Sequence, residues 1–260
     1  MATYFDGLTP LQKQYATALT DEMVKRGITN NFAKAAILSI ISKETEFKPR
    51  AEDLNYSAAR IVEVWPSIPL AVAKTLEHNP EKLGNYVYDP KFNKFLGNLP
   101  GEGYKFRGRG PNQLTGRGNY AAENKRLELI YKQRGLKPVD LIANPELVND
   151  PQVSAIVGVD YFIREFETAK KLGYLTQFNT TDINGFKNQI DSVNAVFQAN
   201  AGWKKKGADT TGGKLKAQSR VDSFLTFVGQ HKVAAAAGGG GFFFSGSPSD
   251  TSTGTEEKTS

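Results

Sequence analysis

The chain has 260 residues, of which 39% are hydrophobic, and this suits one large domain or one domain followed by a tail. A net charge of +6 favours polyanionic partners, which include nucleic acid, anionic membranes and acidic wall polymers. Because cysteine is absent, a disulfide scaffold, thiol catalysis and thiolate zinc sites are excluded. The two histidines, His78 and His231, lie far apart with no ligand-like spacing, so carboxylates are the expected groups for any hydrolytic chemistry.

The N-terminal residues 1–6 contain neither a basic region nor an apolar run, so they do not form a standard secretory signal. No apolar run is long enough to span a bilayer, and we expect no stable membrane insertion. The first predicted helix covers residues 8–27, with Thr9 as its N-cap, Pro10 at the first helical position and Gly27 at its end. Its core-facing residues recur every four positions and are Leu11, Tyr15, Leu19 and Met23.

A second helix is predicted over residues 31–46, capped by Asn30 or Asn31. Its buried stripe consists of Phe32, Ala36, Ile37, Ile40 and Ile41. Glu44 falls on the same stripe, whereas Glu46 projects to another face. Burial on an apolar face and the dipole of the helix end both favour a protonated carboxyl, which is what a general acid needs. The alternative is a helix-end glutamate that reaches solvent.

The remaining elements predict a mainly α domain. Residues 54–120 are rich in Gly, Pro, Asn and Tyr and predict binding loops around a cleft, with short helical pieces near 57–63 and 68–78. Further helices are expected at 121–134, 151–171, 182–198 and 214–230. The domain is expected to span residues 1–232, followed by a disordered low-complexity tail at 233–260. The tail is either a functionless terminus or a docking peptide that orders on a partner.

The segment from Gly101 to Tyr120, GEGYKFRGRGPNQLTGRGNY, carries the most specific chemistry. Its glycines let the backbone pass close to a ligand, and its aromatic side chains can stack on sugar faces. Gln113, Thr115 and Asn119 offer hydrogen bonds to hydroxyl and acetamido groups. RNA-binding tracts repeat RGRG units, whereas this chain has one copy inside a longer motif, so nucleic acid is not the expected partner. The segment also lacks the ending of a P-loop.

At these residues the chain resembles glycoside hydrolase family 19, the family of chitinases and phage endolysins. The segment YKFRGRGPNQLTGRGNY is similar to that family's signature. Glu44 in SKETEF matches the catalytic acid, with Lys43 in place of the usual histidine, and EDLNYSA resembles the ENLNYSA segment of the phage and bacterial branch. Residues 144–151 resemble the start of the next conserved helix, and residues 198–202 resemble a cleft-lining loop. The likeness spans roughly residues 30–225.

The resemblance implies a two-lobed, lysozyme-like fold and inverting chemistry that needs two carboxylates, water and no cofactor or metal. Glu44 would protonate the bridging oxygen, Glu52 would activate a water as base, and Thr115 would help to hold that water. Glu102 and Asp53 are the alternatives for the second carboxylate. The expected substrate-binding residues are Tyr104, Arg107, Arg109, Gln113, Asn119 and Asn200, and either arginine could tune the carboxylates.

The expected function is therefore hydrolysis of β-1,4 glycosidic bonds in bacterial peptidoglycan by an endolysin or virion-associated lysin. A chitinase of the same fold is one alternative, and a non-catalytic protein that binds the wall or builds the virion is another. The enzyme is expected in the host cytoplasm and then in the periplasm and cell wall during lysis, or on a phage virion. The tail at 233–260 is the segment that would dock on a virion partner.

Overall fold

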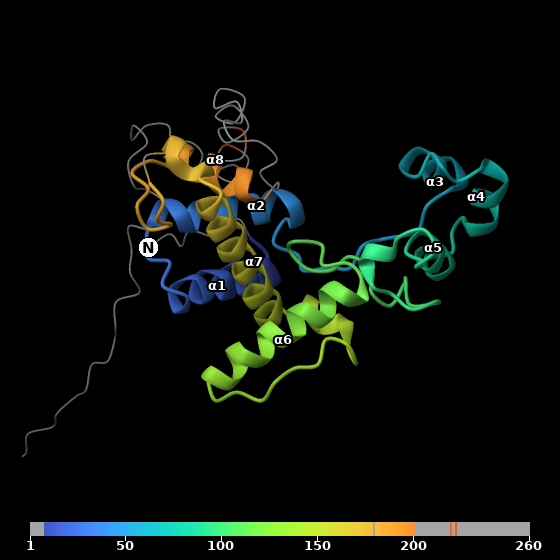
Figure 1. Ribbon diagram of the computed structural model, residues 1–260, viewed down its shortest axis with the longest axis horizontal. Helices are drawn as coiled ribbons and strands as arrows, with labels where there is room; N and C mark the ends of the chain where they lie inside the picture. The colour runs from blue at the N-terminus through green and yellow to red at the C-terminus, as the bar shows by residue number, and fades with distance from the viewer. Residues whose placement is uncertain (1–7, 179, 201–218, 220–221, 223–260) are drawn as a thin grey trace, which may run out of the picture.

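The computed structural model describes residues 8–178, 180–200, 219 and 222, and this part of the chain consists of helices joined by loops (Figure 1). Two isolated β-bridges occur among these residues, which form no extended strand. The α-helices are α1 Pro10–Lys25, α2 Asn31–Thr45, α3 Ala58–Val64, α4 Leu70–Leu76, α5 Pro80–Val87, α6 Arg117–Gln133, α7 Pro151–Lys171 and α8 Gln189–Asn200. Short 3-10 turns lie at Lys94–Leu96, Pro145–Asn149 and Tyr174–Phe178.

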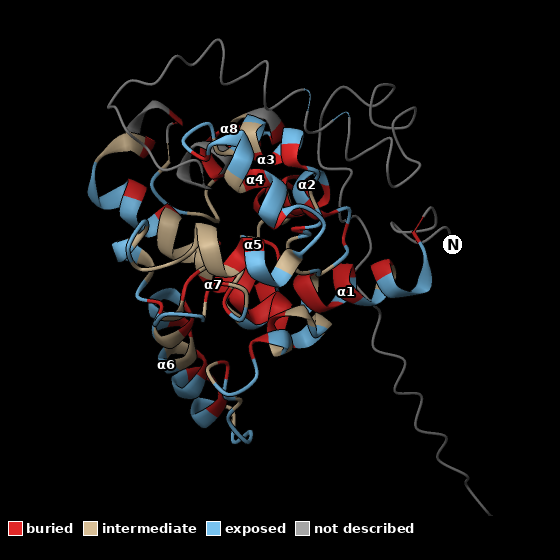
Figure 2. Ribbon diagram, turned by 90° about the vertical axis from the view of Figure 1, so that its right-hand side faces the viewer, coloured by how far each residue is buried: buried red, intermediate tan, exposed pale blue. Residues whose placement is uncertain are grey.

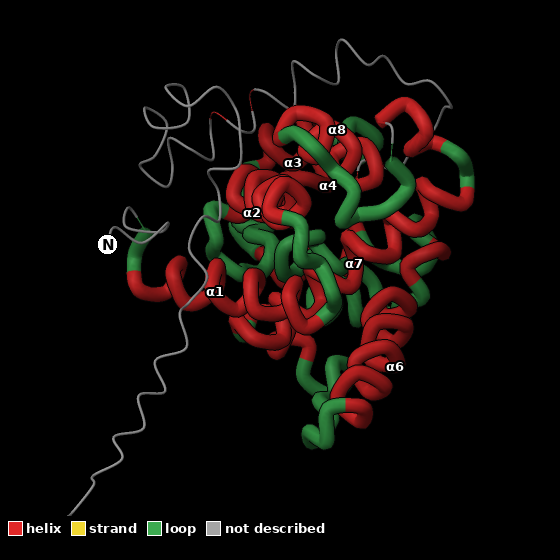
Figure 3. The backbone as a smooth tube through the Cα atoms, turned by 90° about the vertical axis from the view of Figure 1, so that its left-hand side faces the viewer, coloured by secondary structure: helices red, strands yellow, loops and turns green. Residues whose placement is uncertain are grey.

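The larger lobe is built around α7. Helix α1 packs on α7, α2 packs on α8, and their apolar faces form one core that includes Tyr15, Leu19, Ile37 and Phe166. The buried residues gather where α1 and α7 meet (Figure 2). Helix α6 closes the other end of α7 over a second core (Figure 3). The lobe thus joins segments from both ends of the described chain.

The smaller lobe consists of α3, α4 and α5, which stand apart from the rest and are joined to it by loops (Figure 1). It has its own apolar core, in which Leu54, Ile61 and Leu83 are almost fully buried. The predicted mainly α, two-lobed fold is confirmed. The loops between the lobes carry residues 46–57 and 97–116, which contain most of the predicted site.

The predicted start and end of α1 are confirmed. Thr9 and Gln12 form a capping box, and Gly27 follows the helix with φ +78°. Leu11 was expected in the core but is 52% exposed, which corrects the four-residue pattern. Because a helix turns every 3.6 residues, a strict spacing of four drifts by about 120° between Met23 and Leu11. Gln12 is buried at the start of the helix instead.

Other predictions differ from the structure at the ends of elements. Helix α5 lies in the stretch predicted as irregular, although Asn79 and Pro80 form an ordinary helix start in which the Asn79 side chain accepts from the backbone N–H of Lys82. Helix α6 begins four residues before the predicted start, and α8 begins seven residues after it. The predicted helix at 214–230 and the tail at 233–260 lie outside the described residues, apart from positions 219 and 222.

Candidate active site

The glycine-rich segment is joined to the loop that follows α2 by backbone pairing. Residues 50–52 run antiparallel to residues 108–110, and the N–H of Glu52 donates to the Gly108 carbonyl at 2.7 Å. At the other end of this pairing, the N–H of Gly110 donates to the Arg50 carbonyl at 3.3 Å. Arg109 also pairs antiparallel with Leu114, so residues 109–114 form a tight turn. The pairing brings one predicted carboxylate beside the glycine-rich segment, although the two are far apart in sequence.

Arg109 organises the segment from inside, because the residue is only 1% exposed. Its Nη1 donates to the carbonyls of Lys105 at 2.8 Å and Arg107 at 3.2 Å and to the Tyr120 hydroxyl at 3.0 Å. Its Nη2 binds the Glu146 carboxylate, and the hydrogen bond from Arg109 lowers the pKa of Glu146. The prediction that Arg109 contacts the sugar is therefore wrong. A side chain with these partners and this burial holds the loop and cannot reach a polymer.

Arg107 and Tyr104 cover each other at the surface of the segment. The Arg107 guanidinium lies 4.1 Å from the centroid of the Tyr104 ring, and its Nη1 donates to the Tyr104 carbonyl at 3.1 Å. Tyr104 is half-buried, and its N–H donates to the Asn85 side chain in α5 at 2.9 Å. The arginine therefore occupies one face of the ring, and only the rest of the ring is open to a sugar.

Glu52 has a side-chain partner that the sequence did not reveal. The Tyr88 hydroxyl donates to both carboxylate oxygens of Glu52, at 2.7 and 3.0 Å. Burial, followed by the charge of Glu52, raises the pKa of Tyr88, so this hydroxyl stays protonated and remains a donor. Tyr88 lies 36 residues after Glu52, and no local pattern predicts a contact over that separation.

The two alternatives for the second carboxylate support local backbone. Glu102 accepts from the N–H of Leu99 at 2.9 Å and pairs with Arg117 at 3.4 Å. Asp53 is exposed and accepts from the N–H of Asn55 at 2.9 Å, which is an Asx turn. The Tyr88 hydroxyl binds Glu52 at 2.7 and 3.0 Å, whereas the ion pair of Glu102 with Arg117 is longer, at 3.4 Å.

Glu44 lies in the last turn of α2 and is exposed, so the predicted partial desolvation is wrong for the structure without substrate. The buried residues at this end of the helix are Thr45 and Phe47. The helix ends at Thr45, where Glu46 takes a left-handed conformation with φ 52° and turns the chain toward the smaller lobe. Glu44 therefore stands at the point where the chain leaves the larger lobe, accessible to a polymer.

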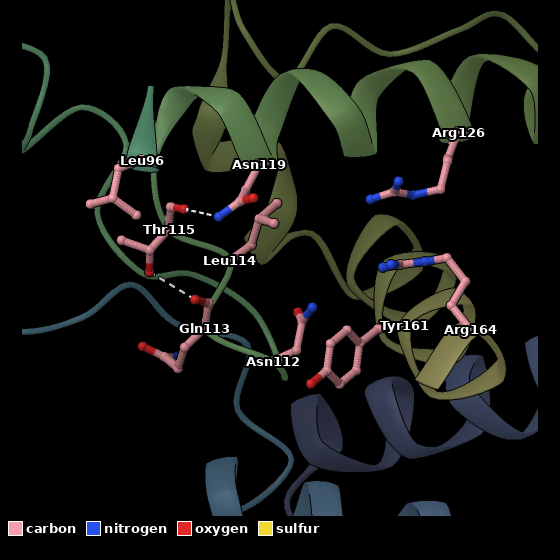
Figure 4. A pocket seen from close by; sticks show the side chains of 9 residues that line it. All are labelled: Leu96, Asn112, Gln113, Leu114, Thr115, Asn119, Arg126, Tyr161 and Arg164. Carbon is pink, nitrogen blue, oxygen red and sulfur yellow. Dashed lines mark hydrogen bonds between the residues drawn. The ribbon is translucent and has the colours of Figure 1, made fainter. Parts of the chain in front are cut away.

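A cavity of about 260 Å³ lies against the glycine-rich segment (Figure 4). Its lining residues are Leu96, Asn112, Gln113, Leu114, Thr115, Asn119, Arg126, Tyr161 and Arg164. Thr115 Oγ1 donates to the Gln113 carbonyl, and Asn119 Nδ2 donates to the Thr115 carbonyl, both at 2.8 Å. A Cβ on Gly108 would lie 2.7 Å from Gln113 Oε1 and 3.2 Å from Thr115 Oγ1, so a larger residue at this position would displace the Gln113 side chain.

The cavity unites three predicted residues with three that sequence reasoning missed. Gln113, Thr115 and Asn119 come from the glycine-rich segment and the start of α6. Arg126, Tyr161 and Arg164 come from α6 and α7, for which the sequence indicates a polar helix and an amphipathic helix but no binding role. Asn200 is the last residue of α8, and its side chain lies outside the described part of the structure.

Among the described residues, no group of three or more His, Cys, Asp or Glu side chains could hold a metal ion. No helix in the same part of the chain is long and apolar enough to cross a membrane.

Comparison with known proteins connects this geometry to a family. No family model matches the chain. A protein of Haemophilus influenzae described as a glycosyl hydrolase family 19 domain-containing protein is 30% identical over 189 residues, which cover 70% of this chain and 85% of that protein. That extent of likeness includes more than one motif and agrees with the helical, two-lobed structure. The chain therefore belongs to glycosyl hydrolase family 19 and is a glycoside hydrolase of the chitinase or lysozyme-like type.

Proposed function

We propose that the chain is a peptidoglycan hydrolase that cuts β-1,4 glycosidic bonds of the bacterial cell wall by inversion. The observation that carries the proposal is the position of Glu52, which is paired through its backbone with Gly108 and held through its carboxylate by Tyr88. Gly108 in turn lies directly beneath Thr115. Glu52 and Thr115 thus both lie against Gly108, which supports the proposal that they share one water as base and as water-holding hydroxyl.

In the proposed reaction, Glu44 donates its proton to the bridging oxygen as the glycosidic bond breaks. Glu52 accepts a proton from a water, and that water attacks the anomeric carbon from the opposite face of the sugar. Thr115 Oγ1 uses its own hydrogen on the Gln113 carbonyl, so its lone pairs are left to accept a hydrogen bond from this water. Gln113 and Asn119 bind the sugar beside it.

Two features of the chain favour peptidoglycan over chitin. The net charge of +6 attracts an acidic wall polymer, whereas chitin is uncharged. The ENLNYSA-like segment at residues 52–58 is similar to the phage and bacterial branch of the family. We therefore propose a phage-type lysin that reaches the wall from the host cytoplasm during lysis or on a virion, with the tail as the docking segment. A chitinase is the second candidate, because it would use the same two carboxylates.

The test is loss of turbidity and release of sugar from Gram-negative cells stripped of their outer membrane, with native protein and with Glu44→Gln. Glu44→Gln keeps the shape of the side chain and removes the proton, so activity should fall by about two orders of magnitude or more. Glu46→Gln is the matched control, because it makes the same change at an exposed glutamate two residues away. Mass spectrometry of the released ends would name the bond.

Equal lysis by the native protein and Glu44→Gln would exclude Glu44 as the acid. If neither protein lyses cells but native protein degrades colloidal chitin, the substrate assignment fails and the chitinase takes its place. If native protein binds purified wall and cleaves neither polymer, a non-catalytic wall-binding role replaces both.

A further inference from the structure

The far wall of the cavity is made by Arg126 of α6 and Arg164 of α7, which the proposed mechanism does not use. Both guanidinium groups point toward the side where Thr115 and Asn119 lie (Figure 4). Their side chains are 33% and 37% exposed, and both residues line the cavity. The cavity therefore combines two cationic groups with the predicted sugar-binding residues.

Buried acids hold the two arginines from behind. Arg126 donates to the fully buried Glu123 through Nε at 3.0 Å and Nη2 at 2.7 Å. Arg164 donates through Nε to Asp160 at 3.0 Å, and Arg26 binds the other oxygen of the same carboxylate at 2.8 Å. Arg26 also lies 4.0 Å from Glu22, so three acids match the three arginines, but the residues that line the cavity include two arginines and no acid. Because the acids fix the orientation of each guanidinium, the outward-facing N–H groups are preorganised for an anion.

We infer that this cavity is a subsite for a carboxylate of the glycan, adjacent to the sugar that Thr115 and Asn119 contact. Paired guanidinium groups match the planar geometry and charge of a carboxylate. Chitin carries no carboxylate, whereas peptidoglycan carries carboxylates on the stem peptide and, where the peptide has been removed, a carboxylate on the lactyl group of muramic acid. The inference rests on the proposed function and deepens it, because it identifies the residues that select the acidic polymer.

Arg164→Gln is the variant that tests the subsite. It removes one cation, and Asp160 keeps its hydrogen bond with Arg26. Arg134→Gln is the matched control, because Arg134 also pairs with a buried glutamate, at 2.7 and 2.8 Å, but does not line the cavity. Circular dichroism and the melting temperature would confirm that both variants fold.

The measurement is equilibrium binding of three soluble fragments to the full chain, made in a Glu44→Gln background so that no fragment is consumed. The fragments are a peptidoglycan disaccharide repeat with its stem peptide, the same glycan freed of peptide, and a chitin oligosaccharide of equal length. Arg164→Gln should weaken binding of one carboxylate-bearing fragment by about tenfold, and less at high salt. Loss confined to the first fragment identifies the stem peptide, and loss confined to the second identifies the lactyl group. Binding of the chitin oligosaccharide should not change.

Equal weakening for all three fragments would mean that Arg164 acts through the fold, and it would overturn the inference. An Arg164→Gln variant that binds every fragment as the parent does would overturn it as well. If the fragments bind as expected but native protein fails to lyse cells, the subsite stands and the proposed activity fails. Absence of binding by any fragment would overturn the subsite and the proposed polymer together.

Discussion

Replacing Arg109 with methionine should unfold the glycine-rich segment, because this buried cation holds it from inside. Methionine is similar in length and removes every donor. Its loss leaves the Lys105 carbonyl without its Arg109 donor and removes one hydrogen bond each from the Arg107 carbonyl and the Tyr120 hydroxyl, which remain bonded to each other. Glu146 loses its cation too, but its side chain is 55% exposed and can be hydrated.

The expected cost follows from these contacts. A hydrogen bond between neutral groups contributes about 1 kcal/mol and one with a charged group about 2 kcal/mol, and a buried group left unpaired costs more. The apolar methionine side chain offsets part of the loss. We therefore expect Arg109→Met to lower the free energy of unfolding by roughly 3–5 kcal/mol. Arg109→Lys should recover only part of this, because an ammonium group cannot reproduce the guanidinium fork.

Urea unfolding followed by circular dichroism measures this difference directly. Arg60→Met is the control, because Arg60 is an exposed residue that pairs with its helical neighbour Glu63, and its loss should leave the free energy of unfolding unchanged. If Arg109→Met unfolds at the same urea concentration as the native protein but binds glycan more weakly, the reasoning is refuted. Arg109 would then be a direct ligand of the sugar.

Two further predictions concern the partners of the carboxylates. Tyr88→Phe removes the hydroxyl that orients Glu52, so kcat should fall by about tenfold or more with KM little changed, and the effect should vanish in a Glu52→Gln background. Glu146→Gln should lower the melting temperature at pH 7, because the hydrogen bond from Arg109 holds the pKa of Glu146 below its ordinary value. That stabilisation is present above about pH 4.3 and is lost as pH falls through the lowered pKa, so native and variant melting temperatures should converge in acid. A constant difference across the acid range would contradict the assignment.

The sequence predicted those parts of the fold that depend on neighbouring residues. The capping box of Thr9 and Gln12 and the Asp150–Pro151 start of α7 are local signals, and both helices begin where these signals stand. Helix α5 was missed because a composition rich in Gly and Tyr outweighed its Asn-Pro start. The late start of α8 has a tertiary cause, since Asn184 accepts hydrogen bonds from the N–H groups that precede α2 and so keeps its own segment in a turn.

The candidate site shows the same difference between local signals, which the sequence reveals, and tertiary contacts, which it does not. The glycine-rich segment was found because its residues are consecutive, and Gln113, Thr115 and Asn119 do line one cavity. The roles inside the segment were not visible, because alternate residues of one short run have different surroundings: Arg109 is almost fully buried, while Arg107 is partly buried against the Tyr104 ring. Tyr88 was not visible, since its contact with Glu52 depends on how two loops meet.

Gln12 of the α1 capping box also makes a contact outside its own helix. The Gln12 side-chain oxygen accepts from the backbone N–H of Thr9, while its Nε2 donates to the Glu46 carbonyl at 2.8 Å, just beyond the end of α2. The Gln12 side chain thus links the start of α1 to the turn that follows Glu44. A truncation that removes residues up to Gln12 would therefore loosen the turn beside the proposed acid, although the missing residues lie more than thirty positions upstream.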